Sequence, residues 1–358
     1  MSTYNFEVKS SIHNYAVDFV MNFSFALRHE LKKGDIVIID EKVLNLYRSG
    51  FEELLTETNH IVIKATEDQK SYLGIMPVIR ELIDRNLRKN NKLIAIGGGI
   101  TQDVTAFISS IMYRGIEWLF FPTTLLAQAD SCIGSKTSVN FEKFKNQLGN
   151  FYPPSKIFID LSFLETLSKS DFSSGLGEMC HYFIISGEED YARFAKEYSM
   201  SINDRTVLEG LIARSLEIKK SIIEIDEFDK NERQVFNYGH SFGHAIESVS
   251  NYKIPHGIAV GKGMDMANFI SEKLGYISSE TRMVIREVLM DICEDFSFKD
   301  ISLDKFKSAL SKDKKNVGKE LVLILNKGFG EIFKSTLVMD EKFDIWLQEY
   351  FDTEMKQL

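Results

Sequence analysis

Five short apolar runs punctuate the first half of the chain, and they constrain the fold more than any other feature. They are rich in β-branched and aromatic residues and have the length of strands: residues 36–39, 61–63, 93–96, 118–121 and 157–159. Helical stretches separate them. Continuous apolar strands that alternate with helices are typical of a parallel sheet covered on both faces. The first half therefore predicts an α/β domain.

The carboxyl ends of these strands carry residues suited to ligand binding. Asp40 follows the first run, Gly97-Gly98-Gly99 the third and Thr123-Thr124 the fourth. In open parallel sheets, ligands bind beyond this edge. We therefore expect a binding site there.

The second half has a different character. Helical segments are expected at residues 170–186, 190–200, 206–225, 231–250 and 257–273, with a late strand at 321–325. The sequence thus predicts two domains, an α/β domain over residues 1–165 and a mainly helical domain over residues 166–358.

Charge and hydropathy exclude some classes of protein. The net charge of −9 and the absence of a long basic run argue against nucleic-acid binding. No apolar run approaches the roughly 20 residues of a membrane span, and the N-terminus lacks the apolar core of a signal peptide. Three widely spaced cysteines build neither a disulfide framework nor a metal knuckle. We expect a cytoplasmic protein.

The glycine triplet allows two interpretations. Glycines between a strand and a helix let backbone amides approach a pyrophosphate at the helix N-terminus. The spacing is not the dinucleotide fingerprint GxGxxG, so a simple tight turn remains the alternative.

A histidine-rich segment is the strongest indication of a metal. His240 and His244 are four residues apart, which places them on one face of a helix, and His256 follows. Glu178 is a candidate carboxylate ligand from an earlier helix. Three protein ligands on zinc leave a position open for substrate. The alternative is a helix with solvated or hydrogen-bonded histidines.

Several cations and an amide lie near these motifs in the sequence. They are Lys136, Lys145, Asn146, Lys219, Arg233, Lys314 and Lys315. Each of them could equally be a solvated surface residue.

Taken together, the motifs resemble the 3-dehydroquinate synthase family of sugar phosphate cyclases from about Asp40 to Lys315. The matching segments, in order, are residues 97–103, 113–115, 122–131, 134–137, 145–146, 175–178, 237–247 and 256–257. The resemblance implies an N-terminal Rossmann-like domain, a helical C-terminal domain and an active site in the cleft between them.

The resemblance also implies the ligands of each cofactor. Zinc, or cobalt in its place, would be held by Glu178, His240 and His256, which leaves His244 as an acid/base or phosphate-side group. NAD would be held by Asp40, Lys42, Glu67, Lys70, Gly97, Gly98, Gly99, Asp103, Thr123, Thr124, Lys145, Phe163 and Thr166.

The remaining implications concern substrate, chemistry and assembly. The implied catalytic groups are His244, Lys136, Asp229, Arg233 and Asn237. The implied substrate contacts are Arg114, Asp130, Lys136, Asn146, Lys219, Arg233, Asn237, His244 and Lys314 or Lys315. In this family the arginine at position 114 reaches the neighbouring subunit's site, which implies a homodimer. NAD oxidises a secondary alcohol and is regenerated after phosphate elimination, so that it acts catalytically.

Some positions depart from the family pattern. His181 stands where the family has lysine, Lys42 where it has asparagine, Ser135 where it has a second glycine, and Ile258 where it usually has glutamate. Residues 139–141 are somewhat similar to relatives that cyclise sedoheptulose 7-phosphate. The expected activity is nevertheless 3-dehydroquinate synthase, because the resemblance implies that Lys219, Arg233 and Asn237 handle the substrate carboxylate. The alternatives are a sister cyclase, a related polyol dehydrogenase, or a binding module that kept only the fold.

Overall fold

The computed structural model describes residues 3–56, 59–142, 144–311 and 320–355. The chain forms two compact units. The first comprises residues 1–167 and 219–228, and the second comprises residues 168–218 and 229–358. Among the described residues, no helix is both long enough and apolar enough to span a bilayer.

A twisted sheet forms the centre of the first unit. Its strand order is β1-β2-β9-β6-β5-β3-β4, and all neighbours are parallel except β1 and β2. The strands are β1 (Phe6–Val8), β2 (Tyr15–Phe19), β3 (Ile36–Asp40), β4 (His60–Ile63), β5 (Leu93–Gly97), β6 (Trp118–Pro122) and β9 (Lys156–Ile159). A separate hairpin joins β7 (Val139–Phe141) to β8 (Phe144–Leu148).

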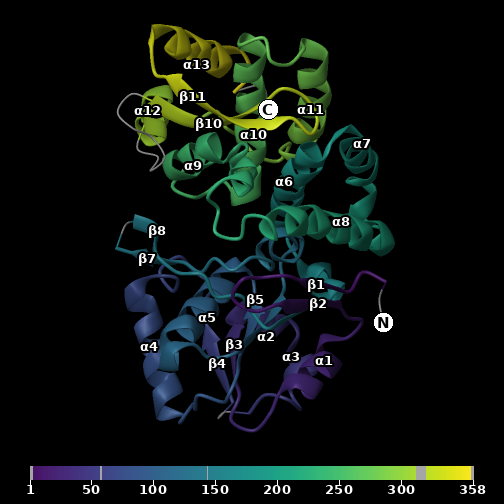
Figure 1. The fold of residues 1–358 in the computed structure, drawn as a ribbon, viewed down its shortest axis with the longest axis vertical. Coiled ribbons are helices and arrows are strands. Elements are labelled where there is room, and N and C mark those ends of the chain that lie inside the picture. The colour runs from purple at the N-terminus through teal and green to yellow at the C-terminus, as the bar shows by residue number, and fades with distance from the viewer. Residues whose placement is uncertain (1–2, 57–58, 143, 312–319, 356–358) are drawn as a thin grey trace. The chain divides into compact units, whose positions relative to one another are not determined.

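Helices cover both faces of this sheet, as continuous apolar strands require. On one face α1 (Phe23–Glu30), α2 (Glu41–Leu46) and α3 (Arg48–Phe51) pack on alternate residues of the strands. On the other face α5 (Gly99–Ile111) packs on β5 and β6, and α4 (Tyr72–Asp84) packs on α5 (Figure 1). Short helical turns complete the unit: η1 (Met112–Arg114), η2 (Ala127–Ser131) and η3 (Leu161–Thr166). The five strands predicted from the sequence are confirmed, and the parallel sheet with them.

A later segment of the chain, residues 219–228, belongs to the first unit. Glu224 accepts a hydrogen bond from the Lys9 backbone (2.8 Å), and Glu227 accepts bonds from Ser10 and Ser11 (2.7 Å each). The ring of Phe228 packs edge-on against Phe151. These contacts attach the segment to the N-terminal residues and to the loop before β9.

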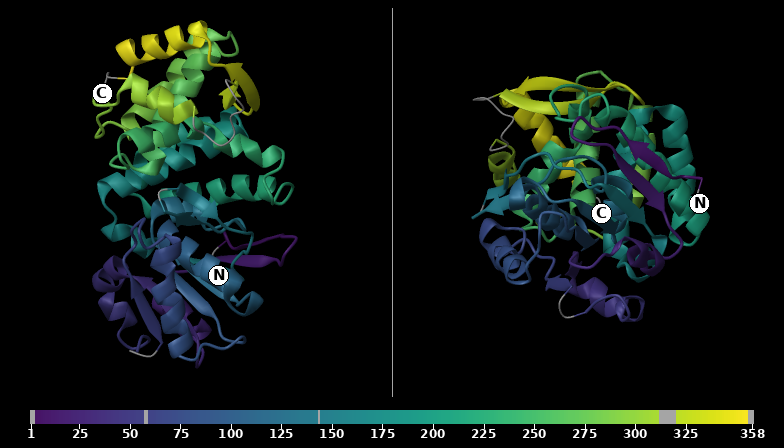
Figure 2. Two further views of the ribbon diagram at one scale, coloured as in Figure 1. Left: turned by 90° about the vertical axis from the view of Figure 1, so that its left-hand side faces the viewer. Right: turned by 60° about the horizontal axis from the view of Figure 1, so that its bottom comes forward.

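The second unit is mainly helical. It contains α6 (Lys169–Ser186), α7 (Glu188–Glu197), η4 (Met200–Ile202), most of α8 (Arg205–Ile223), η5 (Glu232–Asn237), α9 (His240–Val249), α10 (His256–Lys273), α11 (Ser279–Ile292), α12 (Leu303–Ser311) and α13 (Glu341–Thr353). A hairpin of β10 (Glu320–Asn326) and β11 (Ile332–Val338) adds to them. The helix α13, drawn in yellow, packs on α10 and α12 (Figure 2).

The central element of this unit is α10, which is buried from Gly257 to Ser271. A helix buried on all sides must satisfy its charged residues internally. Asp265 accepts a hydrogen bond from the Tyr350 hydroxyl (2.5 Å) and pairs with Arg286. Lys262, whose pKa burial lowers, donates to the backbone carbonyl of Glu354 (3.1 Å). These bonds connect α10 to α11 and to the chain around α13.

The expected helices at 170–186, 190–200, 206–225 and 257–273 are present with shifted ends, and the late strand is β10. The expectation of one helix over 231–250 is wrong. The chain forms η5, then breaks at Gly239, which has φ of +79°, before α9 begins at His240. A Cβ at Gly239 would lie 2.7 Å from the Val260 carbonyl oxygen, so the break is fixed by contact with α10.

Candidate active site

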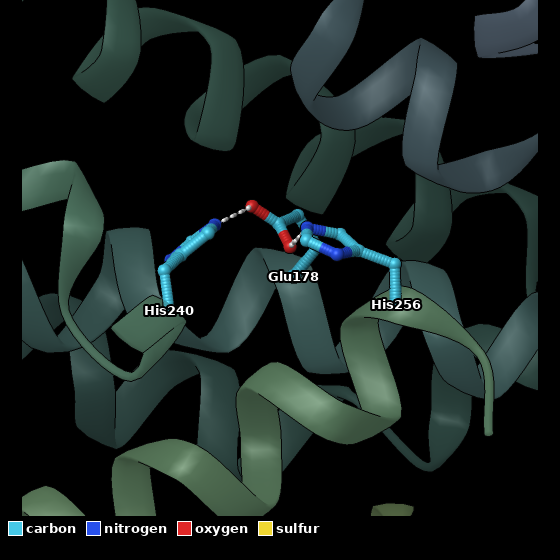
Figure 3. A group of neighbouring side chains, drawn as sticks. All are labelled: Glu178, His240 and His256. Atoms are coloured by element: carbon cyan, nitrogen blue, oxygen red, sulfur yellow. Dashed lines mark ion pairs between the residues drawn. The ribbon is translucent and has the colours of Figure 1, made fainter. Parts of the chain in front are cut away.

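Three separate helices bring Glu178, His240 and His256 together. Glu178 lies in the middle of α6, whereas His240 and His256 are the first residues of α9 and α10. Figure 3 shows the carboxylate of Glu178 between the two imidazole rings. Residues far apart in the sequence thus form one cluster in the second unit.

Glycines beside the three residues allow this approach. A Cβ at Gly177 would lie 2.3 Å from the Gly257 carbonyl oxygen, and a Cβ at Gly257 only 1.8 Å from the Ser174 carbonyl oxygen. Such contacts are far below van der Waals distance, so α6 and α10 pack backbone to backbone here. The adjacent residues Glu178 and His256 are thereby held close to each other.

The distances between the ligand atoms suit a tetrahedral metal. The Nε2 of His240 lies 3.6 Å from Oε1 of Glu178, and the Nε2 of His256 lies 3.5 Å from Oε2. Zinc bonds of about 2.0–2.1 Å in a tetrahedron separate two ligand atoms by about 3.4 Å. The three side chains can therefore hold one zinc-sized ion together with a fourth ligand.

Hydrogen bonds at the far side of each imidazole leave the Nε2 atoms for the metal. The Nδ1 of His240 lies 3.1 Å from the Tyr238 carbonyl oxygen, which can only accept a proton. The Nδ1 of His256 lies 3.1 Å from a carboxylate oxygen of Glu247. Partners of this kind fix the tautomer and the orientation of metal-bound histidines.

The electrostatics of Glu178 point to a bound cation. Its side chain is 4% exposed, and Oε2 accepts no hydrogen bond within the described part of the chain. Burial alone would raise the pKa of Glu178, but His240, His181 and His256 outweigh it and hold the pKa well below its usual range. A buried carboxylate that stays ionised needs positive charge beside it. The residues present thus fit a divalent metal.

A second group of possible ligands shares one residue with the first. It consists of His244, Glu247 and His256. His244 is exposed on α9, and Glu247 already orients His256 through Nδ1. The buried carboxylate of Glu178 makes the first group the better metal site.

The first unit assembles the residues predicted to bind a dinucleotide. Asp40, Gly97 and Thr123 follow or end the neighbouring parallel strands β3, β5 and β6, so they share one edge of the sheet. The Thr123 backbone N–H donates to the Gly97 carbonyl (3.0 Å), and Asp40 caps α2 by accepting from the Lys42 backbone N–H (3.0 Å). Gly98 and Gly99 begin α5, whose first turn carries no acidic residue. This arrangement can receive a phosphate.

Charged residues from the same prediction pair with one another. Glu67 contacts Lys145 at 2.9 Å, and Lys70 contacts Asp103 at 2.5 Å. Burial raises the pKa of Glu67, but its bonds to Lys145 and Asn140 outweigh burial and lower it. Glu67 is therefore an ionised acceptor.

Three further predicted cofactor residues differ in accessibility. The ring of Phe163 is buried between Phe23 and Tyr47, so only its backbone could face a ligand. Thr166 is exposed and shares a hydrogen bond with the Tyr47 hydroxyl (2.9 Å). Thr124 accepts from the Ala127 backbone N–H at 3.2 Å.

The predicted substrate residues are divided between the two units. In the first, Lys219 donates to the backbone carbonyl (2.7 Å) and the carboxylate (2.8 Å) of Asp130. Lys136 has an exposed side chain and pairs through its backbone with Phe151, and Asn146 is exposed on the β7–β8 hairpin.

Arg114 lies on an unusual turn of the first unit. Tyr113, Arg114 and Gly115 all have positive φ (49°, 62° and 111°). Lys89 donates to the carbonyl oxygens of Tyr113 (3.1 Å) and Gly115. The turn holds the Arg114 side chain at the surface.

In the second unit, Arg233 is buried on η5, and the Asn237 amide donates to the Gln234 carbonyl (3.1 Å). Asn237 and Asp229 line a pocket of about 310 Å³ together with Gln234, Ser241, Val322, Ile324 and Lys334. Lys314 and Lys315 lie outside the described residues.

The sequence was compared with known proteins. Residues 60–174 match the 3-dehydroquinate synthase N-terminal family, and residues 175–316 match its C-terminal family. The 3-dehydroquinate synthase of Francisella tularensis subsp. tularensis is 32% identical over 90% of this chain and 92% of its own length. The chain belongs to the 3-dehydroquinate synthase family.

A second relative of the 3-dehydroquinate synthase family is longer. The bifunctional 3-dehydroquinate synthase/phosphatase of Fusobacterium nucleatum subsp. nucleatum is 34% identical over 86% of this chain. The match covers 47% of that protein, so the chain spans about half of its length.

Solved structures share the fold of this family member. The 2-epi-5-epi-valiolone synthase ValA of Streptomyces hygroscopicus subsp. jinggangensis 5008, with NAD+ and Zn2+ bound, is similar with a TM-score of 0.85 and 22% identity, over 95% of this chain and 97% of that one. A 2-deoxy-scyllo-inosose synthase complexed with carbaglucose-6-phosphate, NAD+ and Co2+ gives a TM-score of 0.81 and 20% identity, over 97% of this chain and 99% of that one. The predicted sugar phosphate cyclase fold is confirmed.

Reasoning from the sequence did not assign a role to Glu247, whose carboxylate is hydrogen-bonded to Nδ1 of His256 in the structure. A signal existed, because Glu247 is three residues after His244 and seven after His240, on one face of α9. The naive pairing of His240 with His244 also differs from the structure, which joins His240 and His256 through Glu178.

Proposed function

We propose that the protein is a 3-dehydroquinate synthase that cyclises 3-deoxy-D-arabino-heptulosonate 7-phosphate and releases phosphate. The observation that carries the proposal is the match to 3-dehydroquinate synthases over nine tenths of the chain. The cluster of Glu178, His240 and His256 supports it, because an inert module would not need a buried carboxylate aimed at two imidazoles.

The chain would hold zinc through Glu178, His240 and His256, and NAD through the sheet edge near Asp40 and Gly97. When bound, NAD supplies reversible oxidation of a secondary alcohol, while a divalent metal would polarise the oxygen of that alcohol. Cobalt is an alternative to zinc, since both metals accept nitrogen and oxygen ligands.

The chain's own cations would hold the two anionic ends of the substrate. Arg233 can bind a carboxylate with two parallel hydrogen bonds. Lys219 gives two of its three N–H donors to Asp130, which fixes the ammonium and leaves one donor for a substrate oxygen. The sugar hydroxyls and the phosphate would be bound by Lys136, Asn146 and Asn237.

His244 is our candidate for proton transfer. Its ring centroid lies 5.6 Å from that of His240 and 5.9 Å from that of His256, and the side chain is exposed. An exposed imidazole beside a metal centre can exchange protons with both substrate and solvent. Asp229, with φ of 57° beside the pocket, would orient groups near Asn237.

We further propose a cytoplasmic homodimer. The turn that carries Arg114 is held by Lys89 in a sparsely populated backbone conformation, and such geometry is found where a side chain must be presented. Arg114 would contact substrate in the neighbouring subunit.

The test is phosphate release by the purified protein with NAD present only in trace amounts. A cyclase regenerates NAD and continues to turn over, whereas a dehydrogenase stops when NAD is consumed. Arg233→Ala should lower turnover of the heptulosonate phosphate by about tens- to thousands-fold, from an expected loss of about 2–5 kcal/mol. Arg193→Ala, on the exposed face of α7, is the control and should be silent. Near-normal turnover by Arg233→Ala would remove the carboxylate role.

A sister cyclase is the second candidate. The observations that favour it are Ser135, His181 and the sequence Val139-Asn140-Phe141, which depart from the family pattern. Turnover of sedoheptulose 7-phosphate without turnover of the heptulosonate phosphate would decide for it.

A further inference from the structure

His181 lies one turn after Glu178 on α6 and is fully buried. Its ring contacts Tyr182, with ring centroids 3.9 Å apart, and meets Phe236 edge-on at 6.0 Å. The ring centroid of His240 is 5.7 Å away, also edge-on. His181 is therefore enclosed on the protein side of the metal cluster and contacts two of its three residues.

The contact between His181 and Glu178 has a defined direction. Nδ1 of His181 is hydrogen-bonded to the backbone carbonyl of Glu178. A carbonyl oxygen only accepts, so Nδ1 carries the proton in this structure. The same atom lies 3.7 Å from Oε1 of Glu178. The N–H edge of the imidazole thus lies beside one carboxylate oxygen, beyond hydrogen-bond distance, whether or not the ring is charged.

The geometry excludes two other roles for His181. With no exposed side-chain surface, it cannot touch a substrate that enters from solvent. Among the described residues, His181 belongs to neither of the two groups of side chains that could hold a metal. A lysine at this position, as the family pattern has, would carry its ammonium beyond the space that the imidazole fills.

We propose that His181 is a positioning residue for the metal carboxylate. It holds Oε1 of Glu178 on the side of His240, which directs Oε2 toward His256. A glutamate side chain has three rotatable bonds, so without this contact the carboxylate would spend less time in the orientation that a metal needs. The inference deepens the proposed function, and it rests only on the metal site.

The test measures zinc affinity by competition with a chromophoric chelator, together with kcat and KM. His181→Leu keeps the volume and removes the N–H, and zinc affinity should fall about 10–100-fold. His181→Asn places an amide N–H where Nδ1 lies and should stay within about threefold of the unchanged protein. His181→Gln places its amide where Nε2 lies and should resemble His181→Leu. With zinc added to saturation, kcat should recover while KM stays nearly unchanged.

The matched control is Cys180→Ala, which removes a buried side chain from the same helix without touching Glu178. It should lose stability but retain zinc affinity. Should His181→Leu fail to fold, the difference between the Asn and Gln variants decides instead. Equal zinc affinity for the unchanged protein and for His181→Leu, or for Asn and Gln, would overturn the positioning role. Failure of the proposed function would look different: zinc binding and its dependence on His181 would persist without turnover of the heptulosonate phosphate.

Discussion

The backbone contact between α6 and α10 provides the sharpest test of how the metal site is built. In Gly257→Ala, the new Cβ would lie 1.8 Å from the Ser174 carbonyl oxygen and 3.1 Å from the Glu178 backbone nitrogen. Both neighbours are backbone atoms of a helix, so no side chain can rotate away to make room. The two helices must separate.

The size of the effect follows from the distances. Ordinary contact begins near 3.4 Å, so the start of α10 must move by about 1.6 Å relative to α6. A metal site tolerates errors of only about 0.2 Å in its bond lengths. His256, the neighbour of Gly257, would leave the ligand set. We expect a fall in zinc affinity of at least about 100-fold, and an overpacking cost of about 1–3 kcal/mol.

The assay is zinc affinity by chelator competition, with urea unfolding measured on the same preparations. Gly261→Ala is the matched control, one helical turn further along α10. Its Cβ would lie 3.4 Å from the Cys293 sulfur and 3.9 Å from Cδ2 of Leu289, and both distances are tolerable. Alanine also favours the helix by about 1 kcal/mol over glycine, so this variant should bind zinc normally and be at least as stable.

The reasoning would be refuted by a Gly257→Ala protein with unchanged zinc affinity and stability. A variant that loses stability but binds zinc normally would contradict the link between the helix contact and His256. Loss of zinc in both variants would show that the effect does not depend on the contact with α6.

Three other predictions concern the cofactor edge, the histidine partner and acid stability. Gly98→Val should weaken NAD binding in a fluorescence titration while leaving zinc in place, because its side chain would crowd Thr124 and the phosphate path. Glu247→Gln should lower zinc affinity about tenfold by chelator competition, since the neutral amide holds the Nδ1 proton of His256 less strongly. The hydrogen bonds from Arg214 lower the pKa of Asp190 below its usual value, so the stabilisation is complete above about pH 4 and is lost as the pH falls through the folded pKa. Asp190→Asn should therefore reduce the unfolding free energy by about 0.5–1 kcal/mol at neutral pH, and this reduction should shrink as the pH falls below about 4, as urea midpoints would show.

The central sheet was predictable because its signal is local. Each inner strand, such as Ile36–Asp40 or Leu93–Gly97, is buried on both faces and reads as an unbroken apolar run. The strands β1 and β2, at one end of the sheet, were missed, although Tyr15–Phe19 alternates buried and half-buried residues. Three to five residues are too few for such a period to stand out.

The metal site was only partly predictable for a physical reason. The spacing of four residues predicts that His240 and His244 lie on one face of a helix. The pairing of His240 with His256 depends instead on how α6, α9 and α10 pack. That packing depends on Gly177, Gly239 and Gly257, whose need for a missing Cβ is visible only when their neighbours are known. The roles of the individual substrate and cofactor residues remain predictions.

The return of residues 219–228 to the first unit affects how the chain can be divided. The path passes between the units three times, at 167/168, 218/219 and 228/229. A fragment that ends at residue 167 would therefore lack Lys219, Glu224 and Glu227, and would leave Asp130 and the N-terminal serines without those bonds. No single proteolytic cut or gene truncation can release a complete first unit. A fragment that contains the complete first unit must extend at least to residue 228.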